Sequence, residues 1–167
     1  MRTGSFKGVL LSTLVIVSLV ASITLLLSPS SVHAALTPHA PIYIDGNAGF
    51  TKPDPVNGGG SGTAGDPYII ENWDISASTA HGIEIQNTTA YFIIRNCYLH
   101  DGRNNGNEGI WLENVVNGKI ENSTFENNDH CGIGFIDSDN NIIKNCITKN
   151  NYEQGIILYD SENNIIT

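Results

Sequence analysis

Residues 109–146, GIWLENVVNGKIENSTFENNDHCGIGFIDSDNNIIKNC, decide the fold because they contain the same pattern twice. The pair Gly109-Ile110 returns as Gly132-Ile133, and the triplet Ile120-Glu121-Asn122 returns as Ile143-Lys144-Asn145. Both markers return after 23 residues. Two independent markers that share one period indicate a repeat protein, in which each unit packs on the next.

Both markers continue on either side of this stretch. Gly82-Ile83 and Gly155-Ile156 extend the first marker. Ile70-Glu71-Asn72 and Ile94-Arg95-Asn96 extend the second, and all spacings lie between 23 and 27 residues. Apolar residues alternate after the Gly-Ile pairs, as in Ile83-Glu84-Ile85, which is the period of a β-strand. Because Asn- and Asp-rich segments that favour tight turns lie between, each unit is expected to hold two or three short strands and no helix.

Three kinds of solenoid compete for this period. A leucine-rich repeat requires a frame of Leu, but only four Leu follow residue 34. A left-handed hexapeptide helix requires multiples of six residues, and 23 is not one. The sequence therefore predicts an all-β protein, a right-handed parallel β-helix with coils of about 23 residues, whose successive coils pair about 4.8 Å apart.

In-register stacking would align equivalent residues of successive coils in rows. Four asparagines form one row and are expected to stack at one turn as a structural ladder of buried amides: Asn72, Asn96, Asn122 and Asn145. The residues just before them alternate in charge, which favours cross-strand pairing and indicates a structural role: Glu71, Arg95, Glu121 and Lys144.

The three cysteines Cys97, Cys131 and Cys146 have spacings that match neither a disulfide framework nor a zinc motif. Cys97 and Cys146 each directly follow an asparagine of the row, and Ser123 occupies the equivalent position in the coil between them. Two coils would separate the thiols by about 9.6 Å, beyond the roughly 7 Å reach of a disulfide. We therefore predict that Cys97 and Cys146 are not bonded to each other.

Composition after residue 34 supports a β protein and excludes several classes. This part holds 20 Asn and 20 Ile, whereas a helical domain favours Leu, Ala, Lys and Glu. A disordered chain would not hold so much Ile. Because all 17 acidic residues but only six of the eight Lys and Arg residues lie here, the net charge is −11, which excludes nucleic acid as a partner.

The first 34 residues have a different character. Two cations precede an apolar run, residues 8–27, that is long enough to span a membrane, and a small-x-small cleavage site follows at 32–34. We expect residues 1–34 to be a signal peptide or, if uncleaved, an N-terminal anchor, and the protein to be secreted or at the cell surface. Residues 35–66 are expected to be a lead-in and cap, and residues 67–167 incomplete repeats with further chain after Thr167.

The run 62–70, GTAGDPYII, followed by these repeats, resembles exported right-handed β-helix proteins of the NosD-like type. That group overlaps with carbohydrate-binding and sugar-hydrolase β-helix domains, and the resemblance covers about residues 41–167. It implies a periplasmic copper-binding or carbohydrate-binding role. The N-T-D, D-D and G-H-G signatures of pectinase-like hydrolases do not occur in the sequence, so no catalytic residue is assigned.

Outward-facing strand positions supply candidate carbohydrate-binding residues. Trp111 and Glu84 would share one outward row on adjacent coils, with Gln86 and Glu113 two residues further along. An aromatic ring buries the apolar face of a sugar while amide and carboxylate groups bind its hydroxyls. Asn87 begins a glycosylation pattern and is the expected acceptor, because the similar site at Asn122 is expected to be buried.

A metal site has weaker support. His100, Asp101, His130 and Cys131 lie near the ends of adjacent coils, and soft nitrogen and sulfur ligands suit copper. No motif indicates a cofactor, so copper and calcium both remain open.

The sequence thus predicts a binding or scaffold module that recognises an extracellular polysaccharide or glycan. The alternatives are a fragment of a polysaccharide lyase or glycoside hydrolase, a copper-binding protein, and a structural stalk or adhesin.

Overall fold

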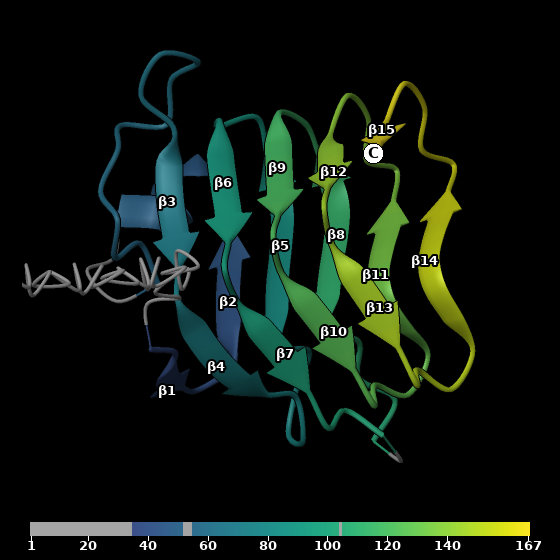
Figure 1. The fold of residues 1–167 in the computed structure, drawn as a ribbon. Coiled ribbons are helices and arrows are strands. Elements are labelled where there is room, and N and C mark those ends of the chain that lie inside the picture. Colours follow the sequence, from purple (N-terminus) through teal and green to yellow (C-terminus); the bar gives the residue numbers. More distant parts are fainter. Residues whose placement is uncertain (1–34, 52–54, 104) are drawn as a thin grey trace, which may run out of the picture. The chain divides into compact units, whose positions relative to one another are not determined.

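Alternating apolar residues form the short strands of a parallel β-solenoid in the computed structural model, which describes residues 35–51, 55–103 and 105–167 (Figure 1). Each coil contributes one strand to each of three parallel sheets. Sheet A contains β1 (Thr37–His39), β4 (Trp73–Ser76), β7 (Tyr98–His100), β10 (Thr124–Glu126) and β13 (Ile147–Lys149). Sheet B contains β2 (Ile42–Asp45), β5 (Ile83–Thr88), β8 (Ile110–Val115), β11 (Cys131–Ile136) and β14 (Gln154–Tyr159). Sheet C contains β3 (Tyr68–Glu71), β6 (Phe92–Arg95), β9 (Gly118–Glu121), β12 (Ile142–Lys144) and β15 (Ile165–Ile166).

The observed register confirms the repeat that the two sequence markers predicted. In sheet B, Ile110 pairs with Ile83 on one side and with Ile133 on the other. In sheet C, Ile120 likewise lies between Ile94 and Ile143. These side chains are fully or almost fully buried, so apolar columns run through the coils and form one continuous core.

The solenoid begins earlier in the chain than the repeat pattern indicated. β1 and β2 lie within the expected lead-in, yet they pair in parallel with β4 and β5. The 3-10 helix η1 (Asn47–Thr51) then places Phe50 against the rings of Tyr68 and Phe92. The predicted lead-in thus supplies two strands of the solenoid and an aromatic side chain, Phe50, that packs against Tyr68 and Phe92.

The predicted signal or anchor, including the apolar run 8–27, lies outside the described residues. Within the part of the chain that the structure describes, no helix is long and apolar enough to cross a membrane.

The predicted asparagine row lies at one turn, and neighbouring amides meet there, since Asn145 Nδ2 donates a hydrogen bond to Asn122 Oδ1 at 3.5 Å. Asn72, Asn96, Asn122 and Asn145 all adopt a left-handed backbone conformation with φ between 50° and 60°. Their side chains are half-buried or exposed, so the expectation of a buried amide ladder was wrong. The row marks a sharp turn between sheets C and A, and Asn is one of the few non-glycine residues that adopt this conformation readily.

Buried amides do form a ladder, at a different corner. Asn141 Oδ1 accepts a hydrogen bond from Gly118 N at 2.7 Å, and its Nδ2 donates to Val115 O at 3.0 Å. In the next coil, Asn164 Oδ1 accepts from Asn141 N at 2.8 Å. These amides satisfy backbone groups that would otherwise be unpaired where the chain turns into sheet C.

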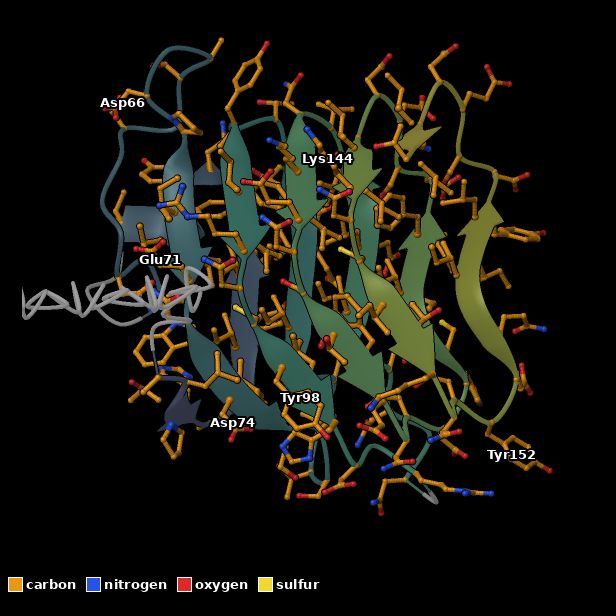
Figure 2. The ribbon with its side chains drawn as sticks, viewed as in Figure 1. Asp66, Glu71, Asp74, Tyr98, Lys144 and Tyr152 are labelled. Carbon is orange, nitrogen blue, oxygen red and sulfur yellow. The ribbon has the colours of Figure 1, made fainter. Side chains whose placement is uncertain are left out.

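The charged row and the cysteines agree with the register. Glu71 pairs with Arg95 across the sheet and forms an ion pair of 2.6 Å. Figure 2 shows Glu71 and Lys144 on different strands of sheet C. All three cysteines are free, and the hydroxyl of Ser123 accepts a hydrogen bond from Cys97 N in the neighbouring coil.

The glycine of each Gly-Ile marker sets the distance between coils. A Cβ atom added to Gly109 would lie 2.6 Å from the carbonyl oxygen of Gly132, and one added to Gly132 would lie 2.8 Å from that of Gly155. Such contacts are too close for any side chain. The marker therefore keeps a glycine because one backbone rests directly on the next.

Candidate functional site

The four predicted carbohydrate-binding residues lie together on sheet B, between its edge and its centre. Glu84 pairs with Trp111, and Gln86 pairs with Glu113, in the register of β5 and β8. Gln86 Nε2 donates to Glu84 Oε1 at 2.8 Å and to Glu113 Oε2 at 3.3 Å. The two carboxylates are therefore held in place by one amide, and all four side chains are half-buried.

Trp111 lies between an imidazole and a glycine. On one side the ring of His81 stacks on the indole, with centroids 5.6 Å apart and planes at 11°. On the other side Trp111 pairs with Gly134, which has no side chain to cover the ring. A Cβ atom at Gly134 would lie 3.0 Å from Trp111 Cε3. The indole therefore packs directly over the backbone of Gly134, where a side chain would crowd it.

A pocket of about 290 Å³ borders Trp111. Trp111, Ile157 and Tyr159 line it along sheet B, and Glu108, His130 and Glu153 line it at the corner between sheets A and B. Its walls are mostly apolar. A concave apolar site with a few polar groups at one end is typical of ligand-binding pockets.

Glu108 is the unusual group at the polar end of the pocket. It lies in the turn between β7 and β8, yet its side chain is only 3% exposed. Its Oε1 lies 3.2 Å from His130 Nδ1, and its Oε2 lies 2.5 Å from His81 Nδ1. A buried carboxylate requires such partners, because burial of an unpaired charge is strongly unfavourable.

The contact between His81 and Glu108 depends on where one proton lies. His81 Nδ1 also lies 3.1 Å from the backbone nitrogen of Glu108, whose N–H can donate to it only if Nδ1 carries no proton. In that state, no described group donates a hydrogen bond to Oε2. With a proton on Nδ1, the ring donates to Oε2 instead. Burial opposes this protonation, but the adjacent Glu108 carboxylate outweighs burial and raises the pKa of His81.

Sequence reasoning did not connect His81 with Glu108, although a signal for the contact was present. Each Gly-Ile marker follows a polar or ionisable residue, and alignment on the marker stacks these residues at one corner: His81, Glu108, Cys131 and Gln154. The sequence pattern gives no sign that Glu108 itself is buried. The segment between β7 and β8 is longer than the segments before β5 and β11, so the repeat does not predict where Glu108 lies.

The structure divides the four predicted metal ligands between two places. His100 contacts Asp101 and Asp74, each at 2.8 Å, on sheet A. His130 instead contacts Glu108, and burial raises the pKa of the Cys131 thiol to about 12. Among the residues that the structure describes, no group of three or more His, Cys, Asp or Glu side chains is arranged to hold a metal ion.

The asparagines of the two glycosylation patterns are both exposed. Asn87 is exposed, and its Nδ2 donates to Asp45 Oδ1 at 2.9 Å. Asn122 is also exposed, so the expectation that it is buried was wrong. The error has the same cause as for the whole asparagine row, whose side chains lie outside the core.

A second pocket, of about 220 Å³, lies on sheet C. Its lining includes Tyr91, Phe92 and Lys119. Tyr91 thus provides an aromatic residue at a pocket on another face of the same solenoid.

Comparison with known proteins extends the description of the fold. Residues 42–167 match a family model described as a right handed beta helix region. No curated protein and no solved structure shows significant similarity to this chain.

Proposed function

The chain belongs to the right-handed β-helix family, and from this premise we propose that it is an exported module that binds an extracellular polysaccharide or other glycan at the Trp111 pocket. The observation that carries the proposal is the half-buried indole of Trp111 in the wall of a mostly apolar pocket. A flat aromatic surface in a mostly apolar pocket fits the apolar face of a pyranose ring. Export is proposed from the leader pattern in residues 1–34.

The arrangement of groups around the indole supports this function. His81 stacks on Trp111 and thereby restricts the orientation of the ring before a ligand arrives. Glu108 and His130 lie at one end of the pocket and offer hydrogen-bonding groups to hydroxyls. A preorganised surface of this kind loses little conformational entropy on binding.

A glycan array tests the proposal with the full chain and three variants. We expect Trp111→Ala to abolish the array signal, because it removes the platform. Gly134→Leu should do the same by displacing the indole, which lies 3.0 Å from the position of an added Cβ atom. The matched control is Tyr91→Ala, which removes an aromatic ring from the pocket on sheet C. If the signal survives Trp111→Ala but is lost in Tyr91→Ala, the site has been assigned to the wrong face.

The alternatives predict other results in simple assays. A polysaccharide lyase or hydrolase would release new sugar ends from its substrate, whereas a binding module would not. A copper-binding protein would retain stoichiometric copper after dialysis. A structural stalk or adhesin that does not recognise glycans would give no array signal.

A further inference from the structure

The outer face of sheet C carries a row of isoleucines. Buried and more exposed side chains alternate along β6 and β12, so Ile93 and Ile142 point away from the core. The strand register continues this outward row to Ile69 at one end and to the exposed Ile165 at the other. Strands that are apolar on both faces are typical of parallel sheets that are covered on both faces. The row therefore indicates a surface that another layer of structure can cover.

Lys119 interrupts this isoleucine row without placing its charge there. It pairs with Ile93 on one side and with Ile142 on the other. Its ammonium group lies 2.6 Å from Glu121 Oε2, two residues further along β9. The aliphatic stem begins in the apolar row, whereas the charge joins the neighbouring charged row. The pocket of about 220 Å³ on sheet C is lined by Ile93, Lys119 and Ile142, so a side chain of a covering layer has room to enter.

The balance of charge on sheet C differs from that of the rest of the chain. The strands of sheet B carry three carboxylates and neither Lys nor Arg. The strands of sheet C carry three cations and two carboxylates, although the whole chain has a net charge of −9. Two copies of so acidic a chain repel each other in most orientations. They repel each other least where sheet C of one copy faces sheet C of the other.

The order of the charges on this face is its own complement when it is reversed. Glu71, Arg95, Glu121 and Lys144 form one row with alternating sign, and Figure 2 labels its first and last members. If two copies pack with opposite solenoid directions, Glu71 faces Lys144 of the second copy. Arg95 then faces Glu121 of the second copy. With parallel directions, or with a shift by one coil, like charges would meet, so the row specifies both orientation and register.

We propose that sheet C docks a second copy of this chain, face to face and with the two solenoid axes antiparallel. A two-fold axis along the strand direction, between β6 and β9, produces this arrangement, because it preserves the position along each strand and reverses the order of the coils. The isoleucine rows then meet and the charged rows pair. Four coil spacings and four residues per strand give a face of about 19 Å by 13 Å. Such a face is smaller than a standard interface, so the dimer is weak and reversible.

Sedimentation velocity of the full chain, from about 1 μM to about 1 mM, tests the dimer. We expect wild type to show a reversible monomer–dimer equilibrium with a Kd of about 10 to 100 μM. Lys144→Glu should raise this Kd at least tenfold, because the two-fold axis brings two pairs of carboxylates together. The matched control is Lys149→Glu on sheet A, which makes the same change of charge at an exposed lysine of the next strand and should leave the Kd unchanged.

Two results of this experiment would overturn the proposal. One is a wild type that remains monomeric over the whole concentration range. The other is an equal change of Kd in Lys144→Glu and Lys149→Glu, which would show that the copies associate through a different face. The circular dichroism spectrum of each variant establishes that it is folded.

An exchange of charges tests the antiparallel orientation. Glu71→Lys alone should dissociate the dimer, because lysines then face each other at both ends of the row. Glu71→Lys combined with Lys144→Glu should dimerise as wild type does. Within one chain this combination only adds repulsion, beside Arg95 and Glu121, so a merely structural effect would make it worse than either single variant.

Arg95→Glu combined with Glu121→Arg makes the same exchange at the centre of the row and provides a second test if the first combination does not fold. We expect a dimer in each folded combination. A folded combination that stays monomeric would overturn the antiparallel arrangement.

Discussion

At the scale of single residues, left-handed turns explain much of the unusual amount of asparagine. Among the described residues, every non-glycine residue with a positive φ is Asn or Asp, and eleven of the fourteen are Asn. For most residues this conformation is unfavourable by about 1–2 kcal/mol. The abundant Asn therefore serves the many turns of short coils.

Asn96, with φ 53°, provides a direct test of this role. We expect Asn96→Ala to lower the free energy of unfolding by about 1 kcal/mol, because alanine is strained in this conformation. Asn96→Gly should lower it less, since glycine adopts positive φ without strain. Urea denaturation of both variants measures the difference. Equal losses would show that the side-chain amide matters more than the backbone conformation.

His81 should contribute to stability in a pH-dependent way. Its pKa is raised in the folded protein, so the folded state binds the proton more tightly than the unfolded state does. This contribution is fully present below the unfolded pKa of about 6.5 and is lost as the pH rises through the higher folded pKa. The difference in unfolding free energy between wild type and His81→Gln should therefore be larger at pH 6 than at pH 8.5, as measured by urea denaturation. A larger difference at pH 8.5 would contradict the raised pKa.

At the scale of elements, turns with buried amides connect the strands. Asn141 is almost fully buried and binds Gly118 N and Val115 O. We expect Asn141→Ala to lower the free energy of unfolding by about 3 kcal/mol, because two buried backbone groups lose their partners. Asn164→Ala, in the same row but less buried and in the last coil, is the matched control and should have a smaller effect. Thermal or urea unfolding compares the two.

Period and alternation were sufficient to predict strands, register and inward-facing residues, because these features repeat along the chain. The same reasoning placed the outward pair Glu84 and Trp111 correctly in register. The repeat pattern could not distinguish the inward-facing row of Asn141 and Asn164 from the exposed row of Asn122 and Asn145. Both rows have one asparagine per coil and differ only in the direction of their side chains. The pattern also missed the contact of His81 with Glu108, because the segment before β8 is longer than the segments before β5 and β11.

At the scale of the whole molecule, a column of glycines lets the coils stack closely. Gly82, Gly109, Gly132 and Gly155 follow one another at one corner, and at the first three a backbone carbonyl of the next coil fills the space that a Cβ atom would need. A backbone cannot move aside as a flexible side chain can. The spacing of the whole solenoid at this corner is thus fixed by residues without side chains.

Gly109→Ala tests this stacking. The added methyl group would meet the carbonyl oxygen of Gly132 at 2.6 Å, so the coils must separate. We expect the free energy of unfolding to fall by at least about 2 kcal/mol, in the range found for overpacked cores. Circular dichroism would show this as a lower melting temperature. Gly65→Ala, where the added methyl group meets no atom within 4 Å, should leave the melting temperature nearly unchanged. Equal melting temperatures for the two variants would show that the corner is more tolerant than its geometry indicates.

The corner between sheets A and B has a consequence for how a protein of this fold can vary in sequence. Strand lengths in sheet B are constant from β5 to β14, but the connecting turns before them, residues 77–82, 101–109, 127–130 and 150–153, differ in length. His81, Glu108, His130 and Glu153 all come from these turns. Replacing one of these turns would therefore change the side chains at this corner and leave the strands, and with them the fold, unchanged.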